Sequence, residues 1–248
     1  MSERLLFNRI ALSYNSKDDH PVCIRPRMHR LLATVIDIET KNKSLLEVGC
    51  GAGHSVKYLP MEYSNFTGID FSEELINLAI NQYGTKSCNI DFINTSLEKF
   101  DPMEKFDVIF MVGVLHHVKD TKEFLSKLLE LSHDETVFAF NEPMDCSFII
   151  SFLRRIRKLL DTSYSNEQFF FKKVEILSML RKNSFDCIKI KNQGFLSTPF
   201  AEVKLRPILI FYPLSLLSVF FDKMISKLPN SITQFFSWNV VVVAKKLK

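Results

Sequence analysis

Three of the seven glycines in this chain, Gly49, Gly51 and Gly53, fall within five consecutive positions. They follow the apolar stretch Ser44–Val48 and precede sequence that is compatible with a helix. Glycine is required where the backbone has a positive φ or where another group approaches the main chain closely. A strand, a glycine turn and a helix in this order are typical of α/β folds that bind a nucleotide over the end of a strand. The cluster therefore predicts a nucleotide-type ligand.

Apolar segments of strand length alternate with helical segments from residue 44 to residue 140, which predicts a doubly wound, mostly parallel sheet with right-handed crossovers. The predicted strands are 44–48, 65–69, 89–93, 106–112 and 135–140, and the predicted helices between them are 53–59, 72–82 and 121–131. After Pro143 we expect helices at 148–160 and 167–182, strands at 185–191 and 240–244, and an apolar segment at 199–228 that is helical in pieces.

The glycine spacing does not fit the dinucleotide fingerprint GxGxxG, which would need a third glycine where the chain has His54 or Val56. The run from Glu47 to Gly53 reads Glu-x-Gly-x-Gly-x-Gly instead. This pattern resembles motif I of the class I S-adenosylmethionine-dependent methyltransferases.

Two later segments resemble the same family, in the same order. Gly68–Ser72 resembles the acidic end of its second strand, and Asp70 in this segment lies 17 residues after Gly53. Phe106–Phe110 and Val114–Val118 resemble its fourth strand and the loop that follows. Three ordered motifs between residues 44 and 140 are a far more specific signal than one glycine cluster.

The resemblance implies an α/β, Rossmann-like sheet of seven strands, six parallel and one antiparallel, with helical insertions after the fifth and sixth strands. We expect a single domain with three regions. Residues 1–43 would form an N-terminal lid and the first helices, residues 44–142 the cofactor-binding core, and residues 143–248 the substrate-binding insertions and the last two strands.

The resemblance also implies S-adenosylmethionine as the cofactor. The residues expected to bind it are Glu47, Gly49, Cys50, Gly51, Gly53, Asp70, Phe71, Ser96 and Gly113. Glu47 would position the glycine turn or the ammonium group of the cofactor, Asp70 would hold the ribose, and Phe71 would cover one face of the adenine. Ser96 stands where the family often has an aspartate for the adenine amino group, so the chain departs from the family pattern there.

The candidate catalytic residues are His116, His117 and Tyr14. The two histidines follow the fourth strand, where a neutral imidazole can take a proton from the nucleophile. Alternatively they shape the loop or cap the next helix, since methyl transfer often needs little beyond alignment. Tyr14 resembles a lid tyrosine of the family, and a plain surface aromatic is the alternative.

Composition narrows the partners and the location. The five cysteines include no CxxC pair, which argues against a zinc site or a disulfide framework, and no metal is expected. A net charge of +4 is too small to indicate nucleic acid. The N-terminal residues lack the apolar core of a signal peptide, so a cytoplasmic location is expected.

Two segments leave membrane contact open. The helix expected at 148–160 has a basic face with Arg154 and Arg155, which we interpret as solvated, although it could also meet an anionic membrane or an acidic substrate. The apolar run Pro207–Phe221 is interrupted by a proline and two serines and is short for a transmembrane helix. Arg25, Arg27, His29 and Arg30 are likewise expected on a solvated face, and the alternative is that they contact an anionic substrate.

These observations predict methyl transfer from S-adenosylmethionine to an oxygen, nitrogen or carbon of a small or lipid-like acceptor. The alternatives are a protein that binds the cofactor without turnover, or a methyltransferase for protein or RNA. A monomer and a homodimer both remain open. The segment Pro143–Ser237 is expected to enclose an apolar acceptor pocket with its phenylalanines, which are Phe148, Phe152, Phe195, Phe200, Phe211, Phe220 and Phe221.

Overall fold

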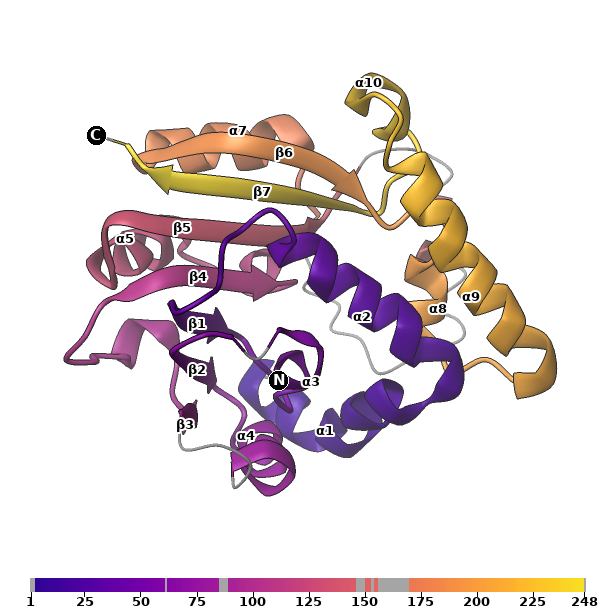
Figure 1. Cartoon of the computed structure of the whole chain (residues 1–248), viewed down its shortest axis with the longest axis horizontal. Coiled ribbons are helices and arrows are strands. Elements are labelled where there is room, and N and C mark those ends of the chain that lie inside the picture. Colours follow the sequence, from indigo (N-terminus) through magenta and orange to yellow (C-terminus); the bar gives the residue numbers. More distant parts are fainter. Residues whose placement is uncertain are drawn as a thin grey trace.

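A seven-stranded sheet organises the chain in the computed structural model, which describes residues 3–60, 62–84, 89–145, 150–152, 154–155 and 170–247. The strands are β1 (Ser44–Val48), β2 (Asn65–Asp70), β3 (Ile90–Asn94), β4 (Phe106–Val112), β5 (Ser132–Pro143), β6 (Phe185–Gln193) and β7 (Asn239–Lys246). Their order is β3-β2-β1-β4-β5-β7-β6, and only β7 runs antiparallel to its neighbours. The predicted mostly parallel, seven-stranded sheet is confirmed (Figure 1).

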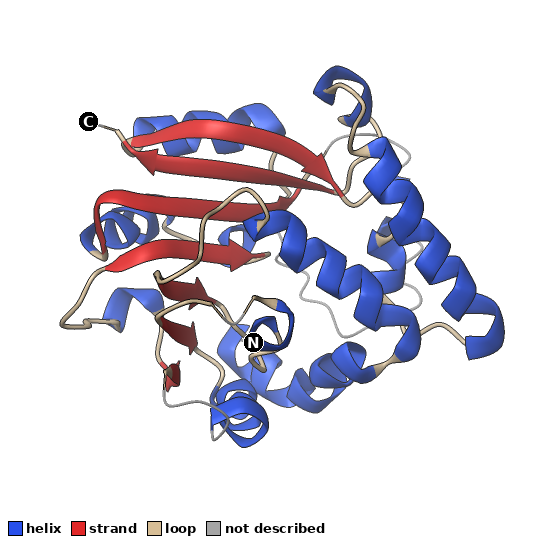
Figure 2. Ribbon diagram, in the orientation of Figure 1, coloured by secondary structure: helices blue, strands red, loops and turns tan. Residues whose placement is uncertain are grey.

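Helices cover both faces of this sheet (Figure 2). They are α1 (Glu3–Asp19), α2 (Pro21–Val35), α3 (Ser55–Tyr58), α4 (Glu73–Ala79), α5 (Thr121–Glu130), α7 (Lys173–Lys182), α8 (Thr198–Glu202), α9 (Ile208–Ile225) and α10 (Asn230–Thr233). The structure also has a π-helical turn at Ile80–Gly84 and 3₁₀ turns at Leu97–Lys99 and Leu115–His117.

Alternate residues of the central strands enter two separate cores. Leu46 of β1 and Ile109 of β4 pack on the side of α5 and α7, whereas Leu45 and Phe110 pack on the side of α2, α3 and α4. Because both faces of the sheet are buried, these strands read as continuous apolar runs rather than as alternating ones.

Several boundaries differ from the sequence prediction. β5 extends from Ser132 to Pro143, beyond the predicted 135–140, because its long pairing with β7 continues to Pro143. The helix predicted at 167–182 begins only at Lys173, after Phe171 has bridged to Met144. Of the helix predicted at 148–160, residues 148–149, 153 and 156–160 lie outside the described residues.

The insertion between β6 and β7 lies at the carboxyl ends of the parallel strands. It consists of α8, α9 and α10, and α9 runs along the outer side of α2 (Figure 1). The N-terminal helices α1 and α2 lie at the same end of the sheet. Helices from both ends of the sequence therefore surround the edge at which open α/β sheets bind their ligands.

Candidate active site

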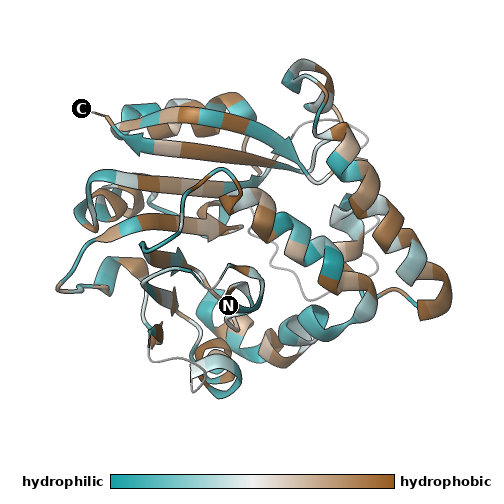
Figure 3. Cartoon of the chain, in the orientation of Figure 1, coloured by the Kyte–Doolittle hydropathy of each residue, from teal (hydrophilic) through white to brown (hydrophobic). Residues whose placement is uncertain are grey.

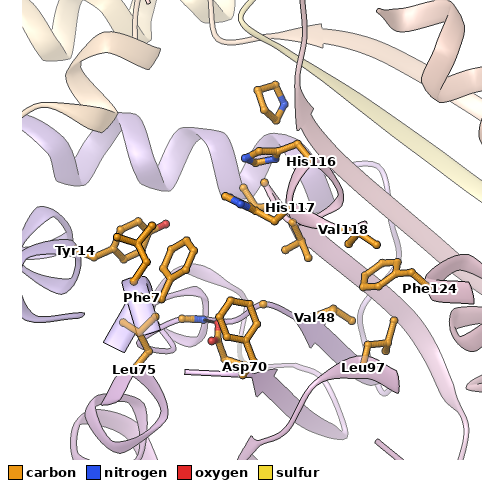
Figure 4. Close-up of a pocket in the computed structure, with 18 of the residues that line it drawn as sticks. Phe7, Tyr14, Val48, Asp70, Leu75, Leu97, His116, His117, Val118 and Phe124 are labelled. Carbon is orange, nitrogen blue, oxygen red and sulfur yellow. Dashed lines mark hydrogen bonds between the residues drawn. The ribbon is translucent and has the colours of Figure 1, made fainter. Parts of the chain in front are cut away.

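A cavity of about 400 Å³ opens at the carboxyl ends of β1, β2 and β4 (Figure 4). Its walls come from α1, from the loops after these strands, and from the segments around α8 and β7. At the end beside the glycine turn, the lining residues include Val48, Gly49, Gly51, Asp70, Phe71, Thr95, Ser96, Leu97, Glu98, Gly113 and Val114. At the other end, which we call the acceptor end, they include Arg30, His116, Pro143, Arg154, Phe170, Thr198, Glu202, Trp238 and Asn239. The cavity thus joins the predicted cofactor residues to residues from the insertions.

The three turn glycines all have a positive φ, but the space beside each of them differs. A Cβ on Gly49 would lie 2.5 Å from Val114 Cγ2, and one on Gly53 would lie 2.6 Å from the Phe92 ring, so both glycines permit close packing. Gly53 does not line the cavity. A Cβ on Gly51 would find only the Tyr14 ring, 3.9 Å away. Gly51 is therefore the glycine whose missing side chain leaves room for a ligand.

Asp70 ties the end of β2 to the glycine turn and to α4. One carboxylate oxygen accepts a hydrogen bond from the Gly51 N–H at 2.9 Å, and the other accepts one from the Ser72 N–H at 2.8 Å. Burial raises the pKa of Asp70 to about 6, although these two hydrogen bonds act in the opposite direction. Each oxygen still has a lone pair for a ligand hydroxyl.

Phe71 and Ser96 line the same end of the cavity. The Phe71 ring meets the edge of Phe7 from α1, with the ring centroids 5.7 Å apart. Ser96 precedes the 3₁₀ turn at Leu97–Lys99, and its hydroxyl makes no capping hydrogen bond to that turn. Glu98, two residues later, also lines this end.

His116 is held by a fully buried carboxylate that the sequence interpretation missed, Glu142 of β5. The Nδ1 atom of His116 lies 2.9 Å from Glu142 Oε2, and the other carboxylate oxygen accepts the N–H groups of Val114 and Leu115 at 2.9 and 2.8 Å. An ionised carboxylate only accepts, so in the neutral imidazole the proton lies on Nδ1 and the lone pair on Nε2. The only signal for this role in the sequence is that Glu142 is an acidic residue directly before Pro143, at the end of a buried strand.

His117 is less suited to take a proton than its neighbour. Burial first, and the adjacent His116 second, lower its pKa to about 4, while Glu3 acts in the opposite direction. Its Nδ1 lies 3.1 Å from Glu3 Oε2, and its ring meets the edge of Phe7. Both partners come from α1, so His117 helps to hold that helix over the cavity (Figure 4).

Tyr14 of α1 lies over Gly51 and lines both the large cavity and a smaller pocket beside it. The guanidinium of Arg27 lies 4.9 Å from the centroid of its ring. Arg27 also forms an ion pair with Asp18 at 2.6 Å and is largely buried. The expectation that Arg27 lies on a solvated face is therefore wrong, because α1 and α8 cover it.

The smaller pocket, of about 90 Å³, contains Glu47 and Cys50, neither of which lines the large cavity. Glu47 accepts a hydrogen bond from the Ser55 hydroxyl, and burial raises its pKa to about 8. Burial also raises the pKa of the Cys50 thiol, so it stays protonated. A buried carboxylate of this kind gains most from a ligand that brings a positive charge.

The far end of the cavity is polar and aromatic rather than walled by the predicted phenylalanines. Arg30 pairs with Glu202 of α8 at 2.5 Å. Arg154 lies 4.1 Å from the Phe170 ring centroid and donates to the Trp238 carbonyl oxygen at 3.1 Å. Both arginines were expected on solvated faces, yet Arg154 is only 9% exposed. The ion pair and the aromatic rings hold these cations at the cavity.

None of the described phenylalanines that were expected to wall the acceptor pocket lines the cavity, and Phe148 lies outside the described residues. Phe152, Phe220 and Phe221 are exposed, and Phe195 is buried elsewhere. The reason is that α9 turns most of its apolar side chains away from the sheet. Among the residues that the structure describes, no group of three His, Cys, Asp or Glu side chains could hold a metal ion.

Residues 46–138 match the family described as a methyltransferase domain. The ubiquinone biosynthesis O-methyltransferase of Pelagibacter ubique is 28% identical over 163 residues, which are 64% of this chain and 68% of that protein. The tRNA U34 carboxymethyltransferase of Alteromonas mediterranea is 32% identical over 96 residues, which are 36% of this chain and 29% of that protein. The chain thus spans about two thirds of the first relative and less than a third of the second.

Two solved structures share the fold over nearly the whole chain. A possible histamine N-methyltransferase from Thermotoga maritima superposes with a TM-score of 0.66 at 16% identity, covering 98% of this chain and 99% of that one. The magnesium protoporphyrin IX methyltransferase of Synechocystis PCC 6803 with bound S-adenosylhomocysteine gives a TM-score of 0.65 at 14% identity, covering 98% and 97%.

Proposed function

Because this chain belongs to the class I S-adenosylmethionine-dependent methyltransferases, we propose that it methylates a hydroxyl oxygen of a small, partly apolar acceptor. The observation that carries the choice of a hydroxyl is the His116–Glu142 pair at the cavity. A histidine oriented by a buried carboxylate is an effective base for an O–H group. The cited Pelagibacter relative is also named for O-methylation.

The residues around the cavity fit the cofactor that the family uses. Asp70 has free lone pairs for ribose hydroxyls, Gly51 leaves space over the turn, and Glu47 is a buried carboxylate with no cation in contact among the described residues. Arg30 lines both pockets and can bind a carboxylate. When bound, S-adenosylmethionine supplies an electrophilic methyl group.

His116 acts at the acceptor. Its Nε2 takes the proton of the acceptor hydroxyl, which leaves the acceptor oxygen as the nucleophile. The methyl group would come from the bound cofactor, whose methyl–sulfur bond would break to leave S-adenosylhomocysteine. Glu142 keeps Nδ1 protonated, so the imidazole can accept at Nε2, and its charge stabilises the imidazolium that results. Figure 4 shows His116 across the cavity from Asp70, as this division of roles requires.

The far end of the cavity favours an acceptor with both a ring and an anionic group. Phe170 and Trp238 supply flat apolar surface, and Arg154 supplies positive charge. A phenol or catechol that carries a carboxylate meets these requirements. Arg154 would bind the anionic group, and the rings would pack on the aromatic part.

The test measures S-adenosylhomocysteine release with a panel of phenols and catechols, with and without a carboxylate. We expect His116→Asn to lower turnover about 100-fold or more while cofactor affinity, measured by calorimetry, stays unchanged. His133→Asn, at the opposite end of β5, is the matched control and should keep wild-type turnover. Wild-type turnover in His116→Asn would refute the base role. Tight cofactor binding without turnover on any acceptor would favour the non-catalytic binding protein.

A further inference from the structure

Helix α9 has its polar side facing the protein and its apolar side facing outward. Its fully or nearly fully buried residues are Ser215, Ser218 and Asp222. Leu209 is 90% exposed and Phe220 is 57% exposed. Other exposed large apolar residues of the helix are Ile208, Ile210, Tyr212, Leu214, Leu216, Leu217, Phe221 and Met224. A helix that packs on a soluble protein normally shows the opposite pattern.

The apolar surface continues beyond the C-terminal end of α9. Leu228, Ile232, Phe235 and Phe236, in and around α10, are all exposed. Figure 3 shows the hydrophobic colouring along α9 on the outer edge of the molecule. We call this surface, formed by the exposed apolar residues from Ile208 to Phe236, the α9 face. Contiguous apolar surface of this kind marks an interaction site.

The exposed charged residues of the segment 203–236, which carries the α9 face, are all basic. Lys204, Arg206, Lys223 and Lys227 are exposed, and the one acidic residue between 203 and 236 is the buried Asp222. Within the part of the chain that the structure describes, no carboxylate forms an ion pair with any of these four cations. Apolar side chains bordered by unpaired cations complement an anionic lipid surface. We propose that the protein docks through the α9 face on membranes that contain anionic lipids.

The hydrogen bonds of Asp222 make α9 an interfacial helix rather than a spanning one. By length and composition alone, the helix could cross a membrane. However, Asp222 accepts hydrogen bonds from the N–H groups of Phe195, Leu196 and Ser197 and from the Ser197 hydroxyl. A membrane-spanning orientation would break all of these hydrogen bonds and separate α9 from α2. Lying in the interface keeps them and buries only the outer side chains.

The same hydrogen bonds connect the α9 face to the cavity. The loop that Asp222 holds runs directly into α8, where Thr198 and Glu202 line the acceptor end. A docked protein would therefore hold its acceptor site close to the lipid surface. The docking itself does not depend on the proposed reaction, and it takes up the membrane contact that the sequence left open.

Cosedimentation with lipid vesicles tests the proposal without measuring methyl transfer. We expect the full chain to bind phosphatidylcholine vesicles that contain phosphatidylglycerol, and to bind pure phosphatidylcholine more weakly. Lys223→Gln/Lys227→Gln should weaken binding to the anionic vesicles about tenfold or more, and added salt should have the same effect. The matched control, Arg181→Gln/Lys182→Gln, removes two exposed cations from α7 and should bind like the wild type.

A second variant tests the apolar part. Leu209→Ser/Phe220→Ser changes two exposed side chains, so the fold should remain intact, and vesicle binding should be lost. Light scattering without vesicles measures the oligomeric state, and so tests whether a second copy of the chain covers the α9 face instead. Failure of the wild type to bind anionic vesicles would overturn the proposal. A stable dimer that Leu209→Ser/Phe220→Ser converts to a monomer would also overturn it, because the face would then be an interface between copies.

Discussion

Asp70 has two tasks, since the carboxylate that faces the cavity also fixes the glycine turn. Its oxygens accept hydrogen bonds from the buried N–H groups of Gly51 and Ser72, so removing the carboxylate affects the fold as well as the cavity. We predict that Asp70→Ala lowers the free energy of unfolding by about 1–3 kcal/mol, the cost of leaving buried donors unsatisfied, and weakens cofactor binding about tenfold or more.

Urea unfolding and calorimetry measure the two effects separately. The matched control is Asp91→Ala, an exposed aspartate in β3, which should change neither quantity. If Asp70→Ala loses stability but keeps its cofactor affinity, the carboxylate serves the turn alone and the ribose role is wrong.

Single residues differ in how far the sequence could reveal them. Gly49, Gly51 and Asp70 lie in local patterns whose spacing is fixed by one turn, so their positions at the cavity could be predicted. Glu142 reaches His116 through the order of the strands, and Arg154 reaches the cavity through its contacts with Trp238. No local spacing encodes either placement. Arg154 also sits in a stretch with four consecutive or nearly consecutive basic residues, where a solvated face is the ordinary expectation.

The pair of helices α8 and α9 acts as one structural unit because Asp222 joins them. Asp222→Asn keeps the size of the side chain but removes its charge and one acceptor oxygen, so at least one N–H or hydroxyl in 195–197 loses its partner. We predict that this variant raises KM for the acceptor, because Thr198 and Glu202 follow the loop, and leaves the Kd of the cofactor unchanged.

Steady-state kinetics and calorimetry on the same preparation decide this point. Asp186→Asn, an exposed aspartate of β6, serves as the control and should behave like the wild type. An equal loss of acceptor and cofactor affinity would mean that Asp222 supports the whole fold rather than the acceptor end.

The orientation of α9 could not be predicted from its own sequence. Its serines repeat at a helical spacing, which does define two faces, but an apolar helix usually buries its apolar side. The partners of Asp222 lie in the loop 195–197, more than twenty positions earlier, and they decide which face points inward. Pairing of this kind depends on tertiary structure and leaves no local pattern.

The overall architecture followed from the alternation of strands and helices, while the strand order did not. Burial on both faces makes β1 and β4 continuous apolar runs, and parallel pairing then follows from the intervening helices. The placement of β7 between β5 and β6 was implied only by the resemblance to the family. The sequence holds no local pattern that indicates which strands pair with β7, so it does not specify that order.

Glu47 gives the whole molecule a pH dependence that the cofactor should reverse. Burial raises its pKa to about 8 in the folded protein, whereas an unfolded glutamate has its ordinary value of 4.5. Between these values the folded state holds a proton that the unfolded state has lost, so stability is full below about pH 4.5 and is lost as the pH rises through 8. Asp70 acts in the same direction at lower pH, from 3.8 to about 6. His117 acts in the opposite sense, and its contribution is lost as the pH falls through about 4.

Comparing Glu47→Gln with the wild type isolates the contribution of this one group. In the ligand-free protein we predict equal stability of the two near pH 4.5, and a growing advantage of Glu47→Gln up to pH 8, by at most about 1.4 kcal/mol per pH unit. Saturating S-adenosylhomocysteine, whose ammonium group can pair with an ionised Glu47, should stabilise the wild type more than the variant at pH 8. Thermal unfolding between pH 5 and pH 8 measures both effects. Parallel pH profiles for the two proteins would show that Glu47 is already ionised without ligand, and would remove the reason for placing the cofactor's ammonium beside it.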